Sequence, residues 1–169
     1  YVDSKGGLPL TERTMADYLK SAGYKTGVIG KWHLGHTEPY HPLSRGFDYY
    51  FGLPYSNDMG CLDSSTSSSV YNIKVDPVCG KNKLWNISLP LYEDRKIIEQ
   101  PVKLVSLTER YAQRAEKFMS AALQEGKPFF MYLPMTHVHV PLSSAVQYTG
   151  NHFVDTVMEM DHYVGKMLS

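Results

Sequence analysis

The sequence predicts an α/β fold, in which a mostly parallel sheet carries helices on both faces. Segments with helical periodicity alternate with short apolar runs, and one of these runs contains no polar residue, as is typical of a strand covered on both sides. The first two helical segments each end at a glycine, shortly before such a run. The 169 residues, 43% hydrophobic and 20% charged, have the composition of an ordinary globular domain.

The first helix is expected to begin after Thr11, which can cap its N-terminus, and to end at Gly23. Its apolar residues share one face: Met15, Tyr18, Leu19 and Ala22. A short strand over residues 24–29 follows and ends at Gly30. The helix and strand together form the first unit of the α/β pattern.

The second helix is expected to open with Ser106 and Glu109, which have the spacing of a capping box, and to end near Gly126. Its predicted buried stripe consists of Tyr111, Ala115, Phe118, Met119 and Ala122. The unbroken apolar strand covers residues 129–133. A third helix is predicted from the spacing of Val154, Val157, Met158, Val164 and Leu168.

Residues 34–103 form a long, loop-rich excursion between the first strand and the second helix. Loops of this length usually carry function or are disordered. Residues 47–53 could be one short strand within it, and the serine-rich run 64–69 is expected at a solvated loop tip.

The charge balance excludes several classes of partner. Seventeen basic residues balance seventeen acidic ones, so no net field attracts nucleic acid or an anionic membrane. No apolar run approaches the ~20 residues that a membrane-spanning helix needs. We therefore expect neither a nucleic-acid partner nor a membrane span.

Polar side chains follow both predicted strands at the point where each strand ends. Lys31 and His33 follow the first strand, and His137 and His139 follow the second. Because ligands of open α/β sheets bind outside the carboxyl ends of the strands, these residues predict an anion site on one rim. A solvated lysine in a turn, or a histidine pair that binds a metal, would explain each element separately. Asp155, Glu159 and Asp161 fit a helix face better than a metal cage.

Three segments carry a family resemblance. Gly23–Gly35 resembles the second sulfatase signature, in which a Gly-Tyr-x-Thr strand leads into Gly-Lys-x-His. Gly52–Asp58 resembles the sulfatase segment with a substrate-contacting serine, and Pro128–Pro141 resembles the segment with the sulfate-binding histidine. The resemblance implies a partial alkaline-phosphatase-like (sulfatase) fold. Residues 1–169 would be part of a single catalytic domain that is truncated at both ends.

The resemblance also implies a site. Lys31 would bind the sulfate, His33 would act as a base, Ser56 would contact the substrate, and His139 would bind substrate and protonate the leaving group. Sulfatases attack sulfur with a formylglycine made from a cysteine in Cys-x-Pro-x-Arg, assisted by one calcium ion. No such motif is present here, so the nucleophile and the metal ligands are expected outside this chain, which alone would be inactive.

The two histidines of His-x-His are expected to differ. Residues two apart on an extended segment point the same way, so both could reach the rim. The family resemblance places the active histidine at the second position, which is His139. His137 is then expected to support the site from behind.

A closer resemblance, carried by residues 40–42, 45–52 and 98–102, is to a lysosomal arylsulfatase that removes 3-O-sulfate from N-sulfoglucosamine in heparan sulfate. It implies a sulfated small molecule or glycosaminoglycan as substrate. Two alternatives stay open: a phosphatase or phosphotransferase of the same superfamily, and a non-catalytic module that binds sulfated glycans.

Two further features favour a lysosomal or secreted protein. Cys61 and Cys79 lie in a polar, serine-rich stretch and are predicted to form a disulfide, which persists only in an oxidising compartment. Asn86 begins the sequon Asn-Ile-Ser and is predicted to carry an N-linked sugar.

Overall fold

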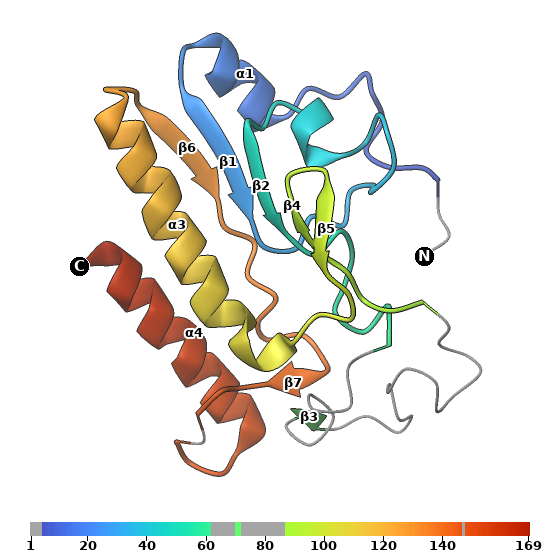
Figure 1. The fold of residues 1–169 in the computed structure, drawn as a ribbon, viewed down its shortest axis with the longest axis vertical. Coiled ribbons are helices and arrows are strands. Elements are labelled where there is room, and N and C mark those ends of the chain that lie inside the picture. Colours follow the sequence, from blue (N-terminus) through green and yellow to red (C-terminus); the bar gives the residue numbers. More distant parts are fainter. Residues whose placement is uncertain (1–4, 62–69, 72–86, 147) are drawn as a thin grey trace.

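The computed structural model describes residues 5–61, 70–71, 87–146 and 148–169 (Figure 1). The helices and strands, in chain order, are α1 (Met15–Ser21), β1 (Lys25–Ile29), η1 (Pro42–Ser44), β2 (Tyr49–Gly52), β3 (Val70–Tyr71), β4 (Leu91–Glu93), β5 (Lys96–Glu99), η2 (Leu104–Ser106), α3 (Leu107–Gln124), β6 (Phe129–Tyr132), β7 (Leu142–Ser143) and α4 (His152–Leu168).

The main sheet has five strands in the order β5-β4-β2-β1-β6. β1 lies between β2 and β6 and pairs in parallel with both, whereas β4 and β5 form an antiparallel hairpin at the β2 edge. The predicted α/β class and the predicted strands around β1, β2 and β6 are confirmed. The hairpin was not predicted, because it lies within the excursion that was expected to be mainly loop.

Helices cover both faces of this sheet (Figure 1). Neighbouring strand residues point to opposite faces. Ile29 packs in the core cluster that contains Phe118 of α3, and its neighbour Val28 packs with Ala16 of α1 in the other. α4 packs along α3 in a further layer (Figure 1). Four residues of the predicted α3 stripe are buried as expected, and Met119 is half-buried.

The predicted start of the first helix is wrong. The cap is Thr14, not Thr11: its Oγ accepts a hydrogen bond from the N–H of Asp17 at 3.1 Å, and its own N–H donates to the Asp17 carboxylate. Thr14 and Asp17 thus form a local capping box, and the Thr14 hydroxyl also lies 2.9 Å from the carbonyl of Arg45. Met15 and Tyr18, predicted on the apolar face, are 64% and 57% exposed, and Ala16 is the buried residue of α1.

The predicted capping box of the second helix is also wrong. Ser106 is the N-cap of α3, but its side chain donates to the carbonyl of Lys103 instead of accepting from the helix. The Ser106 hydroxyl therefore bonds within the preceding turn η2 and does not cap α3. The predicted helix end is correct, since Gly126 has a φ of 64°, in the left-handed region that favours glycine.

α4 occurs where the third helix was predicted, but it buries a different face. Its buried residues are Asp155, Thr156 and Glu159, whereas the predicted apolar residues Val154 and Met158 are 37% and 40% exposed. The Glu159 carboxylate accepts from the N–H of Ala145, and the Asp155 carboxylate accepts from backbone N–H groups of the preceding segment. These two acidic residues therefore anchor the chain that leads into α4.

Two expectations lie outside the described residues. Cys61 is buried, and its backbone bonds to Ile87 and Leu89, but Cys79 and Asn86 are not among the residues described. The disulfide and the sugar therefore stay predictions, as does the loop tip at residues 64–69. No helix in the described ranges is both long and apolar enough to cross a bilayer.

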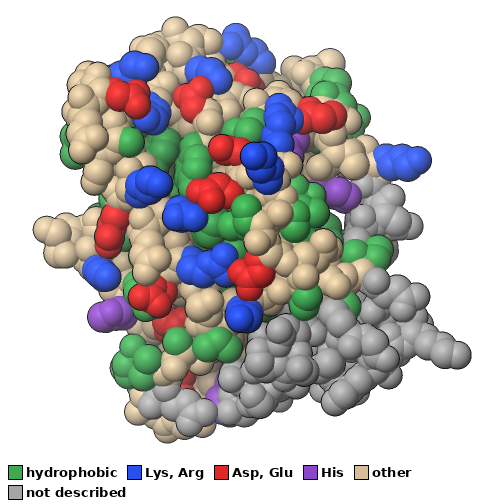
Figure 2. Space-filling model, in the orientation of Figure 1, with side chains coloured by type: hydrophobic (Ala, Val, Ile, Leu, Met, Phe, Trp, Pro, Cys, Tyr) green, Lys and Arg blue, Asp and Glu red, His purple; other side chains and the backbone are tan. Residues whose placement is uncertain are grey.

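On the face shown in Figure 2, Lys and Arg side chains are interspersed with Asp and Glu. Several are paired across elements: Arg114 of α3 contacts Glu93 of β4 at 3.0 Å, and Arg110 contacts Glu99 of β5. This face shows no extended area of one sign, in agreement with the zero net charge.

Candidate anion-binding site at the carboxyl ends of the strands

The turn after β1 depends on two glycines. Gly30 has a φ of 131°, and a Cβ on Gly52 would lie 1.8 Å from the carbonyl oxygen of Gly30. The N–H of Gly30 donates to the carbonyl of Phe51 at 2.8 Å. A side chain at Gly52 would force the ends of β1 and β2 apart, and a Cβ on Gly30 would lie 2.1 Å from the carbonyl oxygen of Pro134, beyond β6. Glycine is therefore required at both positions.

Backbone hydrogen bonds then hold the Lys-Trp-His segment between the two neighbouring strand ends. The N–H of Lys31 donates to the carbonyl of Pro134, beyond β6, at 2.8 Å. The N–H groups of Trp32 and His33 donate to the carbonyls of Leu53 and Pro54, beyond β2. The backbone that carries Lys31 and His33 is therefore fixed on both sides.

Trp32 anchors this segment in the core. Its ring is buried against Phe47 with the centroids 5.7 Å apart, and its Nε1 donates to the carbonyl of Tyr40 at 3.0 Å. Lys31 is half-buried and His33 is exposed. The buried tryptophan therefore fixes the backbone between two side chains that remain accessible to a ligand.

Ser56 and His139 meet across the end of the sheet. Ser56 follows β2 and is 3% exposed, and its Oγ lies 3.4 Å from both ring nitrogens of His139. The Nδ1 of His139 also lies 2.7 Å from the carbonyl oxygen of Val140. Since a carbonyl only accepts, Nδ1 carries the proton, and Nε2 is left to exchange a proton with a ligand.

The pKa of His33 depends on charged groups at the same end of the sheet. Although the His33 side chain is exposed, partial desolvation by the surrounding protein is the largest effect and lowers its pKa; the charge of Lys31 lowers this pKa further, and His139 makes a smaller contribution in the same direction. Asp58 acts in the opposite direction and raises this pKa. His33 is therefore biased toward the neutral form, which can accept a proton.

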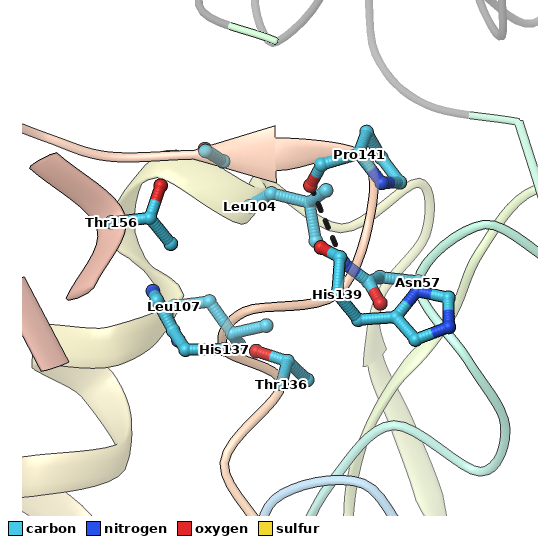
Figure 3. Close-up of a pocket in the computed structure, with 9 residues that line it drawn as sticks. Asn57, Leu104, Leu107, Thr136, His137, His139, Pro141 and Thr156 are labelled. Carbon is cyan, nitrogen blue, oxygen red and sulfur yellow. Dashed lines mark hydrogen bonds between the residues drawn. The ribbon is translucent and has the colours of Figure 1, made fainter. Parts of the chain in front are cut away.

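The two histidines of His-x-His point to different places (Figure 3). The Nε2 of His137 lies 2.9 Å from the hydroxyl of Thr108 and 3.6 Å from a carboxylate oxygen of Glu159. The extended geometry assumed from the sequence is wrong at this point. Residues 137 and 138 form a turn, in which the N–H of His139 donates to the carbonyl of Thr136 at 3.1 Å.

The structure thus brings Ser56 and His139 into contact and places Lys31 and His33 at the same end of the sheet. The sequence predicted these four residues but missed two neighbours. Asp58 lies 4.0 Å from Nδ1 of His139, and Asn57 donates to the carbonyl of the same residue. Their position directly after Ser56 was the available signal.

A metal centre is not formed by the residues described. Within residues 5–61, 70–71, 87–146 and 148–169, no three His, Cys, Asp or Glu side chains are placed to hold an ion. The described residues therefore do not provide a cage for the calcium that the resemblance implies, whose ligands were expected outside this chain. What the arrangement offers chemically, at one end of the sheet, is a lysine, an imidazole biased toward its neutral form, a hydroxyl and a second imidazole.

Solved structures share this architecture. A sulfatase from Pseudoalteromonas sp., PsFucS1, superposes with a TM-score of 0.70 at 24% identity, covering 93% of this chain and 34% of that one. Ps i-CgsB, solved in complex with a neocarrahexaose, superposes with the same TM-score and covers 98% of this chain and 37% of that one. These likenesses confirm the sulfatase fold expected from the sequence.

Sequence relatives are consistent with the fold. Arylsulfatase G of Canis lupus familiaris is 46% identical over 98% of this chain and 33% of its own length. Arylsulfatase G of Homo sapiens is 49% identical over 83% of this chain and 28% of its own length, and bovine (Bos taurus) arylsulfatase A is 34% identical over 98% and 33%. The chain thus spans about a third of the length of these relatives.

The sulfatase family model matches residues 1–169. The chain belongs to the sulfatase family. Its similarity to arylsulfatase G is the closer resemblance that the sequence indicated.

Proposed function

We propose that this chain supplies the sulfate-binding side of the active site in a longer enzyme that hydrolyses sulfuric esters. The observation that supports this most strongly is the contact of Ser56 with the His139 ring at 3.4 Å, at the same strand ends that carry Lys31 and His33. A hydroxyl and an imidazole from separate strand ends meet where α/β folds bind their ligands. Such donors suit an oxyanion.

The proposed roles follow from the chemistry of each group. Lys31 provides a positive charge for the sulfate oxygens. His33, with its lowered pKa, is neutral and takes up a proton, whereas His139 gives a proton from Nε2 to the departing alcohol oxygen. Ser56 contacts the substrate beside His139. A formylglycine nucleophile and a calcium ion would supply attack on sulfur and polarisation of the sulfate, both from residues outside this chain.

The finer assignment is by resemblance. The identity with arylsulfatase G supports a lysosomal or secreted enzyme that acts on a sulfated small molecule or glycosaminoglycan. We propose the 3-O-sulfate of N-sulfoglucosamine in heparan sulfate as the substrate group. Release of sulfate from defined heparan oligosaccharides by the full-length enzyme tests this, and cleavage of a different sulfate position would contradict it.

The roles of the two histidines can be separated in the full-length enzyme. We expect His139→Ala to lower kcat by ~10²-fold or more for an aryl sulfate with a poor leaving group, because that phenolate needs a proton to depart. The loss should be much smaller for a good leaving group. His137→Ala should lower stability and leave this dependence unchanged.

The measurement is kcat for a series of aryl sulfates whose phenols differ in pKa, together with urea denaturation of each variant. If His137→Ala removed the leaving-group-dependent catalysis and His139→Ala did not, the assignment would be wrong. A full-length protein that binds sulfated glycan but releases no sulfate would instead support the non-catalytic alternative.

A further inference from the structure

The buried side chain of Asn57 connects the two segments that form the site by hydrogen bonds. Its side chain is 4% exposed, and its Nδ2 donates to the carbonyl of His139 at 3.2 Å and to the carbonyl of Pro141 at 3.4 Å. Two carbonyl acceptors on the same side fix the orientation of the amide, because only its NH₂ can donate to them. Figure 3 shows Asn57 beside His139 and Pro141.

The segment held by Asn57 is exposed at its first two residues, whereas Pro141 is buried. His139 and Val140 both face solvent, and the bond from the N–H of His139 to Thr136 is local. Asn57 therefore connects the backbone of His139 to the chain that follows β2. Ser56, the preceding residue, contacts the ring of the same histidine, so one dipeptide holds both its backbone and its side chain.

The other end of the amide faces a small cavity. The Oδ1 of Asn57, the Nδ1 of His137 and the Oγ of Ser143 are buried and have no hydrogen-bond partner among the described residues. All three residues line the cavity in Figure 3, where the space open to the centre of a water molecule is about 10 Å³. That is about the room one water needs. Asparagine suits this position because it donates at one end and accepts at the other.

We propose that Asn57 is a positioning residue that sets the place of His139 against the substrate. This rests on the role proposed for His139 as the proton donor to the leaving group. Replacing the Asn57 NH₂ with an oxygen would set it against two carbonyl oxygens and release the His139 backbone. A proton donor displaced by about an ångström loses much of its effect.

The test uses the full-length enzyme and the same series of aryl sulfates. We expect Asn57→Asp, which keeps the shape of the side chain but loses the donor, to lower kcat for a poor leaving group by between about 10-fold and 10²-fold. For a good leaving group kcat should change little. If the aspartate variant does not fold, Asn57→Leu replaces it, since leucine has a similar branched shape without polar atoms. It should show the same split, meaning a fall in kcat for poor leaving groups but not for good ones. Ser143→Ala lines the same cavity without touching His139 and should leave both rates unchanged.

The outcomes separate this inference from the proposed function. An equal fall for good and poor leaving groups in a folded Asn57 variant, or no fall, would overturn the positioning role while His139→Ala still shows the split. If His139→Ala itself shows no dependence on the leaving group, the proposed role of His139 fails and this inference fails with it. A split in Ser143→Ala equal to that in Asn57→Asp would assign the effect to the cavity and overturn the specific role of Asn57.

Discussion

At the scale of single residues, the charged neighbours of His33 act on it in opposite directions. Lys31 lowers the pKa of His33 and Asp58 raises it, in addition to the larger effect of partial desolvation, which lowers it. A histidine whose pKa is lowered stays neutral to more acidic pH, and this extends the range over which it can accept a proton.

We therefore expect opposite shifts from two substitutions. Lys31→Met should raise the pKa of His33, because a nearby positive charge is lost, and Asp58→Asn should lower it further. The pKa is measured by NMR titration of the His33 imidazole in the folded protein. In the full-length enzyme, Asp58→Asn should also move the acid limb of the pH–rate profile to lower pH. Shifts of the same sign in both variants would show that the rim is arranged differently.

The stability cost expected for His137→Ala also has a pH dependence. Burial alone would raise the pKa of Glu159, but hydrogen bonds from His137, Thr108 and the N–H of Ala145 outweigh it and lower this pKa. The stability that these bonds provide is therefore present above the unfolded pKa of a glutamate and is lost as pH falls through the folded pKa. Removing His137 should accordingly cost most stability near neutral pH and less in acid.

At the scale of elements, α1 offers a direct test of its cap. We expect Thr14→Ala to lower the free energy of unfolding by ~1 kcal/mol, since the Thr14 Oγ satisfies an N–H of the first helical turn. Thr11→Ala is the matched control and should change stability little, because Thr11 is exposed and lies outside the helix. Urea denaturation of both variants measures the difference, and a larger loss for Thr11→Ala would restore the cap expected from the sequence.

Helix and strand ends could be predicted where local backbone geometry determines them. Gly23 and Gly126 end their helices by local backbone geometry, and both were identified. Thr14 was missed although Thr14 and Asp17 have the spacing of a capping box, a local signal that was overlooked in favour of Thr11. In the β4–β5 hairpin, Ile97 and Ile98 are both partly exposed, so it lacks the alternation that indicates a strand.

In the candidate site, too, some residues could be predicted from the sequence and others could not. Lys31, His33 and His139 were placed on one rim because each follows a strand, and parallel strands end at the same edge. The separation of His137 from His139 depends on a turn at residues 137–138 and on Thr108 of α3, and no local pattern indicates either. Asn57 was missed because its importance comes from carbonyls more than eighty residues away in sequence.

At the scale of the whole molecule, the proposed binding groups occur in a sequence that lacks the motif for the sulfatase nucleophile. Neither Cys61 nor Cys79 lies in the Cys-x-Pro-x-Arg motif from which sulfatases make formylglycine. In the roles proposed here, Lys31 and the histidines hold the anion and move protons, but that motif would have to supply the group that attacks sulfur. Binding groups alone give only a small part of the rate of a complete catalytic set.

We therefore expect the 169-residue chain, purified and shown by circular dichroism to be folded, to release no sulfate from an aryl sulfate above the uncatalysed rate. The control is the same preparation of Lys31→Ala, since activity from a contaminating sulfatase would be equal in both samples. Heat-labile turnover that disappears with Lys31→Ala would contradict the prediction, because it would show that the chain contains its own nucleophile. Replacing Cys61 and Cys79 with serine would then show whether that nucleophile is a cysteine.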